Sequence, residues 1–141
     1  MNGRKSLPGR ALIALGLIAA LTAPALTQRP ARPAALQKLQ AGLWQLRDLE
    51  NPKAELPPVC LGDPNLLVQL RHRSAVCSRI VVAENQGTAT VHYTCPAAGY
   101  GQTLIRIETP RLAQIETQGI ADNRPFSSRL EARRVGRCPG N

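Results

Sequence analysis

Cysteine is the residue type with the clearest chemistry in this chain, and four cysteines are present: Cys60, Cys77, Cys95 and Cys138. An even number of cysteines in an exported chain indicates disulfide bonds, because compartments outside the bacterial cytoplasm are oxidising. Tetrahedral zinc is the competing interpretation, but no two of these cysteines form the Cys-x-x-Cys pair that zinc sites commonly use. We therefore expect two disulfides and no metal site.

The residues between the second and third cysteines select one of the pairings that four cysteines permit. Asn85-Gln86-Gly87 is a turn signal between two extended runs, residues 78–84 and 88–94. A hairpin folded there places Cys77 opposite Cys95, at the separation that a cross-strand disulfide requires. The predicted pairing is therefore Cys77–Cys95 and Cys60–Cys138.

Catalytic chemistry has few residues available. The two histidines are His72, which we expect to be exposed at a helix end, and His92, for which we expect a structural role on a strand. Glu108 and Glu116 are a conceivable carboxylate pair for glycoside hydrolysis, but both are expected to face outward. No G-x-S-x-G, phosphate-binding loop, dinucleotide fingerprint or H-E-x-x-H motif occurs. The sequence favours a protein that is not an enzyme and uses no cofactor.

Arginine dominates the charge of the chain, which has 18 basic and 9 acidic side chains and a net charge of +9. Arginine binds carboxylates and phosphates through paired hydrogen bonds, so an anionic envelope component or an acidic protein is the expected partner. Solvated arginines encoded by a GC-rich genome are the alternative interpretation. With one Trp, two Tyr and one Phe, the chain lacks stacking platforms for nucleic acid. The densest group is the candidate anion-binding site: Arg129, Arg133, Arg134 and Arg137.

The N-terminal residues have the layout of a secretory signal. Arg4, Lys5 and Arg10 precede an apolar run over residues 11–21, and Ala23-Pro24-Ala25 offers small side chains for cleavage. The apolar run is short for a membrane-spanning helix, which needs about 20 residues. We expect a periplasmic or secreted product that does not span a membrane after cleavage. The predicted organisation is a signal peptide (1–25), a flexible lead-in (26–40) and a disulfide-stapled β domain (41–141).

Short strands are the elements that must position the cysteines and arginines. Alternating apolar and polar residues predict strands over residues 43–49, 78–84, 88–94, 103–109, 112–119 and 126–133. Asp63 before Pro64 predicts the start of a helix that reaches residue 73, and residues 34–40 are compatible with a short helix. Residues 97–101 are expected to form a turn. The predicted fold class is mainly β (α+β), an antiparallel meander of about six strands in a curled sheet or partial barrel, with one short helix inserted after the first strand and two disulfides.

Several motifs along the chain carry a resemblance to a known family. They are Gly42-Leu43-Trp44, Cys60-Leu61, Val91-His92-Tyr93-Thr94-Cys95 and Arg133-Arg134-Val135-Gly136-Arg137-Cys138. In this order the chain resembles the proteobacterial exported family called domain of unknown function 3617, which has a G-x-W start, a cysteine-leucine pair and a terminal R-x-G-x-C. The resemblance spans nearly all of the chain after residue 25 and implies an exported, mostly β domain without an assigned activity. The chain departs from the family in lacking its methionine- and glycine-rich tracts and in its high arginine content.

Two functions of different classes are compatible with these residues. The first is a non-enzymatic interaction or structural domain of the cell envelope, acting through the arginines of the last strand and sensitive to salt. The second is a carrier for a small apolar or amphipathic ligand held in a cavity inside the curled sheet. We expect the apolar side chains to fill the interior themselves, which favours the first function. The side chains concerned are Trp44, Val91, Ile105, Ile107, Ile115 and Phe126.

Overall fold

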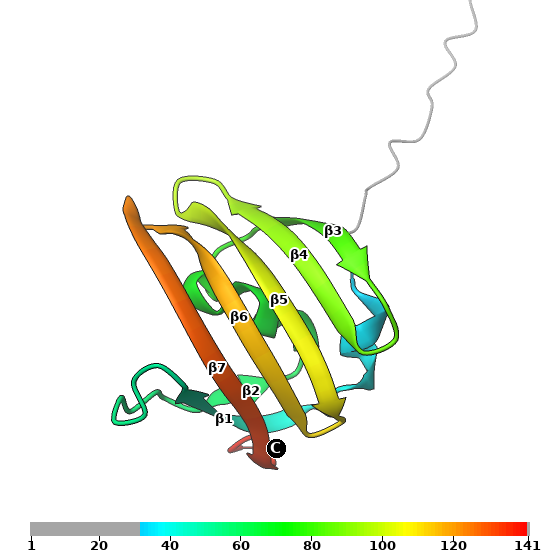
Figure 1. The fold of residues 1–141 in the computed structure, drawn as a ribbon. Helices are drawn as coiled ribbons and strands as arrows, with labels where there is room; N and C mark the ends of the chain where they lie inside the picture. Colours follow the sequence, from blue (N-terminus) through cyan, green and yellow to red (C-terminus); the bar gives the residue numbers. More distant parts are fainter. Residues whose placement is uncertain (1–31, 141) are drawn as a thin grey trace, which may run out of the picture.

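An antiparallel sheet of seven strands curls around two short 3-10 helices in the computed structural model, which describes residues 32–140 (Figure 1). The strands are Gly42–Asp48 (β1), Val59–Leu61 (β2), Ser78–Glu84 (β3), Thr88–Cys95 (β4), Gly99–Thr109 (β5), Leu112–Ala121 (β6) and Arg124–Gly136 (β7). The helices are Ala34–Lys38 (η1) and Pro64–His72 (η2). The predicted signal peptide, residues 1–25, and residues 26–31 of the predicted lead-in lie outside the described residues.

The order of the strands is β2-β1-β7-β6-β5-β4-β3. Strands β3 to β7 follow one another as a meander, and β7 then pairs with β1, which lies far away in the sequence. The edges of the sheet are β2 and β3, so the sheet is curled and open. The predicted fold class is therefore confirmed, and the short helix expected after the first strand is present as η2, with β2 between it and β1.

The central hairpin has the register that its turn predicts. Arg79 lies opposite Tyr93, and Val81 lies opposite Val91. The register shifts by one residue between Val81 and Ala83, which is the signature of a β-bulge. A bulge adds a residue to one strand only. The pairing that is symmetric about Gln86 therefore holds from the cysteines to Val81, and between the bulge and the turn it is displaced by one residue.

Both predicted disulfides are confirmed, and each fastens one edge of the open sheet. Cys60 lies in β2 and is joined to Cys138, which follows β7, with a Cα–Cα distance of 5.5 Å. Cys77 immediately precedes β3 and is joined to Cys95 at the end of β4, with a Cα–Cα distance of 4.2 Å. An edge strand has hydrogen-bonding partners on one side only. The disulfides therefore hold the two strands that the sheet itself holds least.

The number of strands and the start of β5 differ from the sequence prediction. The sheet has seven strands rather than six, because the three-residue strand β2 is too short to show alternation and is held by Cys60 and by the buried side chains of Val59 and Leu61. Strand β5 begins at Gly99, inside the predicted turn 97–101. The turn closes within three residues because Ala97 adopts a φ of 63°, which brings Cys95 and Gly99 opposite each other.

Residues 34–39 are packed, which corrects the predicted flexible lead-in (26–40) for these residues and agrees with the short helix expected over residues 34–40. Residues 34–38 form η1, and Leu36 and Leu39 are buried in the core. The backbone N–H of Ala35 donates a hydrogen bond to Glu84 Oε1 at 2.9 Å, which ties η1 to the end of β3. The apolar side chains of this short helix cover the inner face of the sheet, so this segment is ordered by packing.

Helix η2 begins where the sequence predicts, with Asp63 as its N-cap. Asp63 Oδ1 accepts a hydrogen bond from the backbone N–H of Asn65 at 3.0 Å. Gln69 has non-helical angles (φ −128°, ψ 41°), so the helix is kinked in its second half. The buried side chains of Leu67 and Val68 fill the concave side of the sheet.

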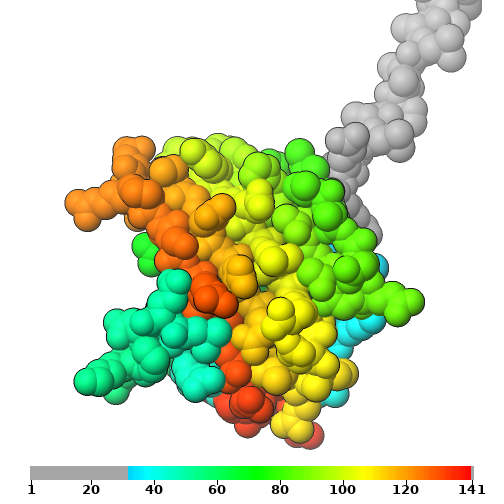
Figure 2. All heavy atoms as spheres, viewed as in Figure 1, coloured from blue at the N-terminus to red at the C-terminus, as the bar shows by residue number. Residues whose placement is uncertain are grey.

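The concave face, which we call the inner face, is packed by the protein's own side chains. Trp44, Val91, Ile105 and Ile115 are buried there between the strands and the two helices. These four of the six side chains expected to fill the interior do so, Ile107 is partly buried against them, and Phe126 is half-buried outside the core and lines a surface depression. The convex face, which we call the outer face, is not covered by any element of residues 32–140 and is seen from the front in Figure 2.

Candidate functional site

The four arginines of the predicted anion site lie in three different surroundings. Side chains alternate along β7, so Arg129 and Arg133 share the outer face. Arg134 alternates with them, and its Nε donates a hydrogen bond to the carbonyl oxygen of Ala41 at 2.8 Å. Arg137 is exposed beyond the end of the strand. The structure therefore brings two of the four arginines to one face and does not assemble all four into a pocket.

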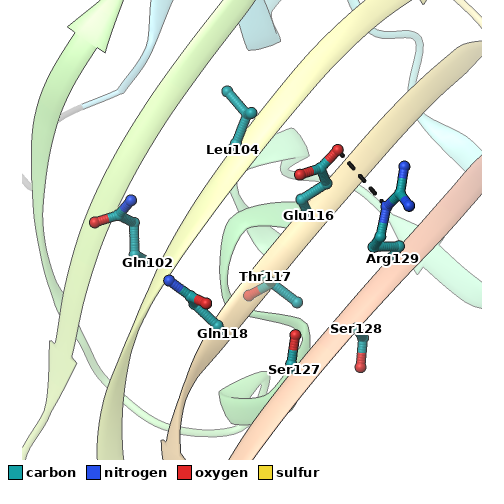
Figure 3. Close-up of a pocket in the computed structure, with 8 residues that line it drawn as sticks. All are labelled: Gln102, Leu104, Glu116, Thr117, Gln118, Ser127, Ser128 and Arg129. Atoms are coloured by element: carbon teal, nitrogen blue, oxygen red, sulfur yellow. Dashed lines mark ion pairs between the residues drawn. The ribbon is translucent and has the colours of Figure 1, made fainter.

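The outer-face arginines have carboxylates beside them. Arg129 Nε lies 3.8 Å from Glu116 Oε1 on β6 (Figure 3). Glu131 Oε1 lies 3.5 Å from Arg133 Nη2 and also 3.5 Å from Arg47 Nη2 on β1. These arginine side chains are more than half exposed, so each pair contributes little to folding, between about 0 and 1 kcal/mol. Their effect is to cancel charge, so this part of the outer face presents mixed charges rather than a positive field.

Two adjoining shallow depressions lie in the middle of the outer face. The first has a volume of about 240 Å³ and is drawn in Figure 3. The second has a volume of about 350 Å³. Gln102 on β5 and Gln118 on β6 lie opposite each other and line both depressions. We call this region the outer patch, and the residues that define it are His92, Tyr100, Gln102, Leu104, Glu116, Gln118, Ser127 and Arg129.

The outer patch combines hydrogen-bonding groups with exposed apolar surface. Gln102, Gln118 and Ser127 supply amide and hydroxyl groups. Tyr100 is 52% exposed and Leu104 is 37% exposed, and both side chains stand on β5. Such a mixture is typical of surfaces that bind a partner, because the amides give direction and the apolar groups give contact area. Sequence reasoning missed this patch, because its polar residues come from different strands and no local motif joins them.

His72 is buried, at 5% exposure, which contradicts the expectation that it is exposed. The kink at Gln69 turns the last part of η2 toward the sheet and carries the imidazole inward. His72 Nε2 lies 3.0 Å from the carbonyl oxygen of Ala98, and Nδ1 lies 3.3 Å from the hydroxyl of Tyr93. A carbonyl oxygen only accepts, so Nε2 carries the proton and Nδ1 accepts from Tyr93. Both ring nitrogens are therefore used in the fold.

A buried polar cluster continues from Tyr93 along the inner face. Burial raises the pKa of the Tyr93 phenol, and the nearby Thr117 hydroxyl and Arg71 charge oppose this effect. The hydroxyls of Thr117 and Thr103 are hydrogen-bonded at 2.7 Å, and Thr103 also donates to the carbonyl oxygen of Val68 at 2.7 Å. These contacts satisfy buried polar groups between β5, β6 and η2, so the cluster joins the helix to the sheet.

A second ionic group surrounds the start of η2. The Arg79 guanidinium is half-buried and donates to Gln69 Oε1 through both Nε and Nη2, at 2.9 Å for Nε. Burial lowers the pKa of Arg79, against the opposing effect of the Asp63 charge. Burial disfavours the ionised form of Asp63, but hydrogen bonds from Asn65 and the charges of Arg32 and Arg79 outweigh it, so its pKa lies below the ordinary value. This group orders the helix start and was not predicted.

Of the remaining candidates for catalysis, the two glutamates each lie beside an arginine, whereas the histidine is exposed rather than part of the packing. Glu108 Oε1 accepts a hydrogen bond from Arg106 Nε at 2.7 Å, and Glu116 faces Arg129. His92 is exposed on the outer face of β4. Within residues 32–140, no group of three or more His, Cys, Asp or Glu is arranged to hold a metal ion. A helix long and apolar enough to cross a membrane is likewise absent from the described part of the chain.

Comparisons of the chain with protein-family models, with curated proteins and with solved structures gave no match. The resemblance to domain of unknown function 3617 therefore stays a prediction that rests on the sequence motifs alone. Within the fold, those motifs have structural roles: Trp44 lies in the core, and Cys60 and Cys95 form disulfides. The surfaces that the domain leaves open are thus the features that bear on function.

Proposed function

We propose that this protein is a non-enzymatic interaction domain of the cell envelope that binds a partner through the outer patch. The observation that carries this proposal is the contrast between the two faces of the sheet. The inner face is filled by side chains such as Trp44 and Ile105, whereas the outer face is open and holds two adjoining depressions. A sheet face that combines amides with exposed tyrosine and leucine is suited to recognition.

Export to the periplasm or beyond is part of the proposal. Two disulfides are typical of proteins in oxidising compartments. The basic and apolar layout of residues 1–25, followed by small residues, supports a cleaved secretory signal. Both features are consistent with a small exported domain that gains stability from covalent cross-links.

The partner that best fits the outer patch is an envelope glycan that carries hydroxyl and amide groups. Gln102 and Gln118 can hydrogen-bond to such groups, and the exposed ring of Tyr100 offers a flat apolar surface for a sugar ring. An anionic polymer or acidic protein is less well supported, because it would have to displace Glu116 from Arg129 and Glu131 from Arg133. We therefore expect the neutral polar groups of the outer patch, rather than the arginines, to make the main contacts with the partner.

The surroundings of the titratable residues support a non-enzymatic role. His72 is buried, and both of its ring nitrogens have hydrogen-bonding partners. Glu108 and Glu116 are each placed beside an arginine. General acid–base catalysis needs a group that can reach a substrate and exchange a proton with it. None of these three side chains combines solvent access with an unengaged proton-transfer group. His92, the fourth candidate, is exposed and lines the second depression of the outer patch, where an imidazole can hydrogen-bond to a bound glycan.

Binding of a soluble N-acetylglucosamine oligomer to the oxidised protein, measured by calorimetry, tests the proposal. We expect Tyr100→Ala to weaken binding by about tenfold or more, as truncation of an aromatic hot spot does. Val135→Ala is the matched control, because Val135 is similarly exposed at 53% and lies outside the patch. Affinity should change little between low and high salt. Equal binding by Tyr100→Ala would overturn the assignment of the patch, and binding to acidic polymers that salt abolishes would favour the arginines.

A further inference from the structure

A third opening lies on another part of the molecule, where the end of η2 approaches β1 and β7. It is a cleft of about 280 Å³. Leu46 and Leu130 form its floor from β1 and β7, and both are buried. Leu70 of η2 and Leu56 of the loop after β1 form its walls and are half-buried. The cleft therefore presents four leucine side chains to whatever enters it.

Two arginines stand at the rim of this leucine cleft. Arg71 and Arg73 line it from the end of η2, and both are exposed. Within residues 32–140, neither arginine forms an ion pair with a carboxylate, unlike the arginines of the outer face. Their positive charges are therefore available to a ligand, whereas Arg129 and Arg133 already have acidic neighbours.

Contacts of the rim residues favour an anion at this position. The Arg71 guanidinium carbon lies 5.6 Å from the centroid of the Phe126 ring, a cation–π contact that restricts the side chain while leaving N–H groups free. Asp48 is the acidic residue of the lining, and its Oδ1 accepts hydrogen bonds from the backbone N–H groups of Glu50 and Asn51. These hydrogen bonds hold the Asp48 carboxylate in the adjacent turn, and with two arginines against one carboxylate the lining of the cleft keeps a net positive charge.

We propose that the leucine cleft binds a single-chain anionic amphiphile, with its alkyl chain on the leucines and its headgroup at Arg71 and Arg73. The headgroup chemistry is a carboxylate or a phosphate, both of which arginine binds through paired hydrogen bonds. Since the volume of the cleft lies just below the usual range for ligand pockets, one short chain fits and a two-chain lipid does not. The site lies at the mouth of the curled sheet, so the filled interior does not exclude it.

This site is separate from the outer patch, so the two proposals can fail independently. The linings of the leucine cleft and of the two outer-face depressions have one residue in common, Ser128 of β7. A ligand in the cleft should therefore perturb the backbone of Leu46, Leu70 and Leu130. It should leave that of Tyr100 unchanged.

The experiment is a titration of the oxidised, isotope-labelled protein followed by amide chemical shifts. Octanoate and octyl phosphate are the two anionic probes, octan-1-ol supplies the chain without charge, and inorganic phosphate supplies the charge without a chain. We expect an anionic probe to bind about tenfold more tightly than octan-1-ol, because charge-assisted hydrogen bonds are added. The comparison of octanoate with octyl phosphate identifies the preferred headgroup.

Variants test the arginine rim and the leucine lining of the cleft separately. Arg71→Gln with Arg73→Gln should weaken the anionic probe by about tenfold and leave octan-1-ol unchanged. Arg111→Gln with Arg124→Gln is the matched control, because it removes the same charge from two exposed arginines that form no ion pair within residues 32–140 and lie outside the cleft, and it should leave affinity unaltered. Leu56→Phe should weaken all three chain-bearing probes by filling the cleft. Equal loss in the control, equal binding of octan-1-ol, or the same shifts with inorganic phosphate alone would overturn the proposal.

Discussion

The inner and outer faces of this sheet are made from the same strands but differ in what their side chains contact. On the inner face, Trp44 and Tyr93 are buried, and the polar side chains of Tyr93, Thr103 and Thr117 are hydrogen-bonded within the protein. On the outer face, Tyr100 and Leu104 are exposed, and the charged groups pair loosely at distances up to 3.8 Å. Because successive side chains of a strand point to opposite faces, one strand can serve folding and recognition at once. Substitutions on the two faces should therefore affect different properties.

The sharpest test of this difference is truncation of the largest inner side chain. Trp44→Ala should destabilise the domain by about 3–5 kcal/mol, because it removes buried apolar surface and leaves a cavity. Tyr100→Ala on the outer face should change stability by about 0.5 kcal/mol or less. Chemical denaturation of the oxidised proteins measures both values. A similar loss in the two variants would mean that the outer patch belongs to the folding core.

Removal of the hairpin disulfide should have the next largest effect. Cys77→Ala with Cys95→Ala should cost about 3 kcal/mol by the chain-entropy model for a loop of this length. The loss should also loosen the neighbouring Tyr93, which packs in the same small cluster as the two cysteines. Urea unfolding gives the stability, and amide exchange at β3 and β4 gives the local effect. Unchanged exchange there would show that the inner face holds the β3 edge without the disulfide.

His72 and His92 are the same residue type on opposite sides of the sheet, so the same substitution can be compared at both positions. His72→Ala should destabilise the protein by about 1–3 kcal/mol, because it leaves the Ala98 carbonyl and the Tyr93 hydroxyl without their partner. His92→Ala should have an effect of about 0.5 kcal/mol or less, because His92 is exposed on the outer face. Thermal unfolding of both variants measures the contrast. Equal melting temperatures would contradict the buried hydrogen bonds assigned to His72.

Acid titration should reveal the ionic group at the start of η2. The pKa of Asp63 is lower in the folded protein than the ordinary value of 3.8, so ionised Asp63 contributes stability above that value. This contribution should be lost as pH falls through the lowered folded pKa. Asp63→Asn keeps an N-capping side chain and removes the charge. The difference in stability between the parent and this variant should therefore be constant near neutral pH and shrink in acid, and a difference that grows in acid would contradict the sign.

The smallest effect is expected for the ion pairs of the outer face. Glu116→Gln should change stability by about 0.5 kcal/mol or less, because Glu116 and Arg129 are both more than half exposed. The same substitution removes an acidic neighbour of Arg129 and should raise affinity for polyanions at low salt. Denaturation and polyanion binding at two salt concentrations measure the two effects. A large loss of stability would show that the outer face carries more of the folding energy than its exposure suggests.

Sequence reasoning succeeded where the structure depends on neighbouring residues. The Asn85-Gln86-Gly87 turn and the alternation around it determined the register of Arg79 with Tyr93 and the pairing of Cys77 with Cys95. The N-cap at Asp63 likewise marked the start of η2. These features rest on local turn chemistry and on a two-residue period, which are readable in a few consecutive positions.

The features that sequence reasoning missed depend on contacts between distant segments. Strand β2 forms beside β1, and β1 inserts beside β7, so neither pairing is apparent from a local pattern. The kink at Gln69 decides whether His72 faces solvent or Tyr93, and no turn residue marks that kink. The four arginines of the candidate anion site do not share one face, because alternation along β7 separates Arg133 from Arg134.

The sequence by itself determined that the chain forms a disulfide-linked, mainly antiparallel β domain with an arginine-rich composition. Alternation, turn residues and cysteine positions suffice for this because each acts over a short stretch of chain. Only the tertiary structure decided which arginines have acidic neighbours and which line a cleft. Arg129 meets Glu116 across two strands, whereas Arg71 stands beside Phe126 at the rim of the leucine cleft. Those pairings arise from strand order and helix placement, which are properties of the whole fold.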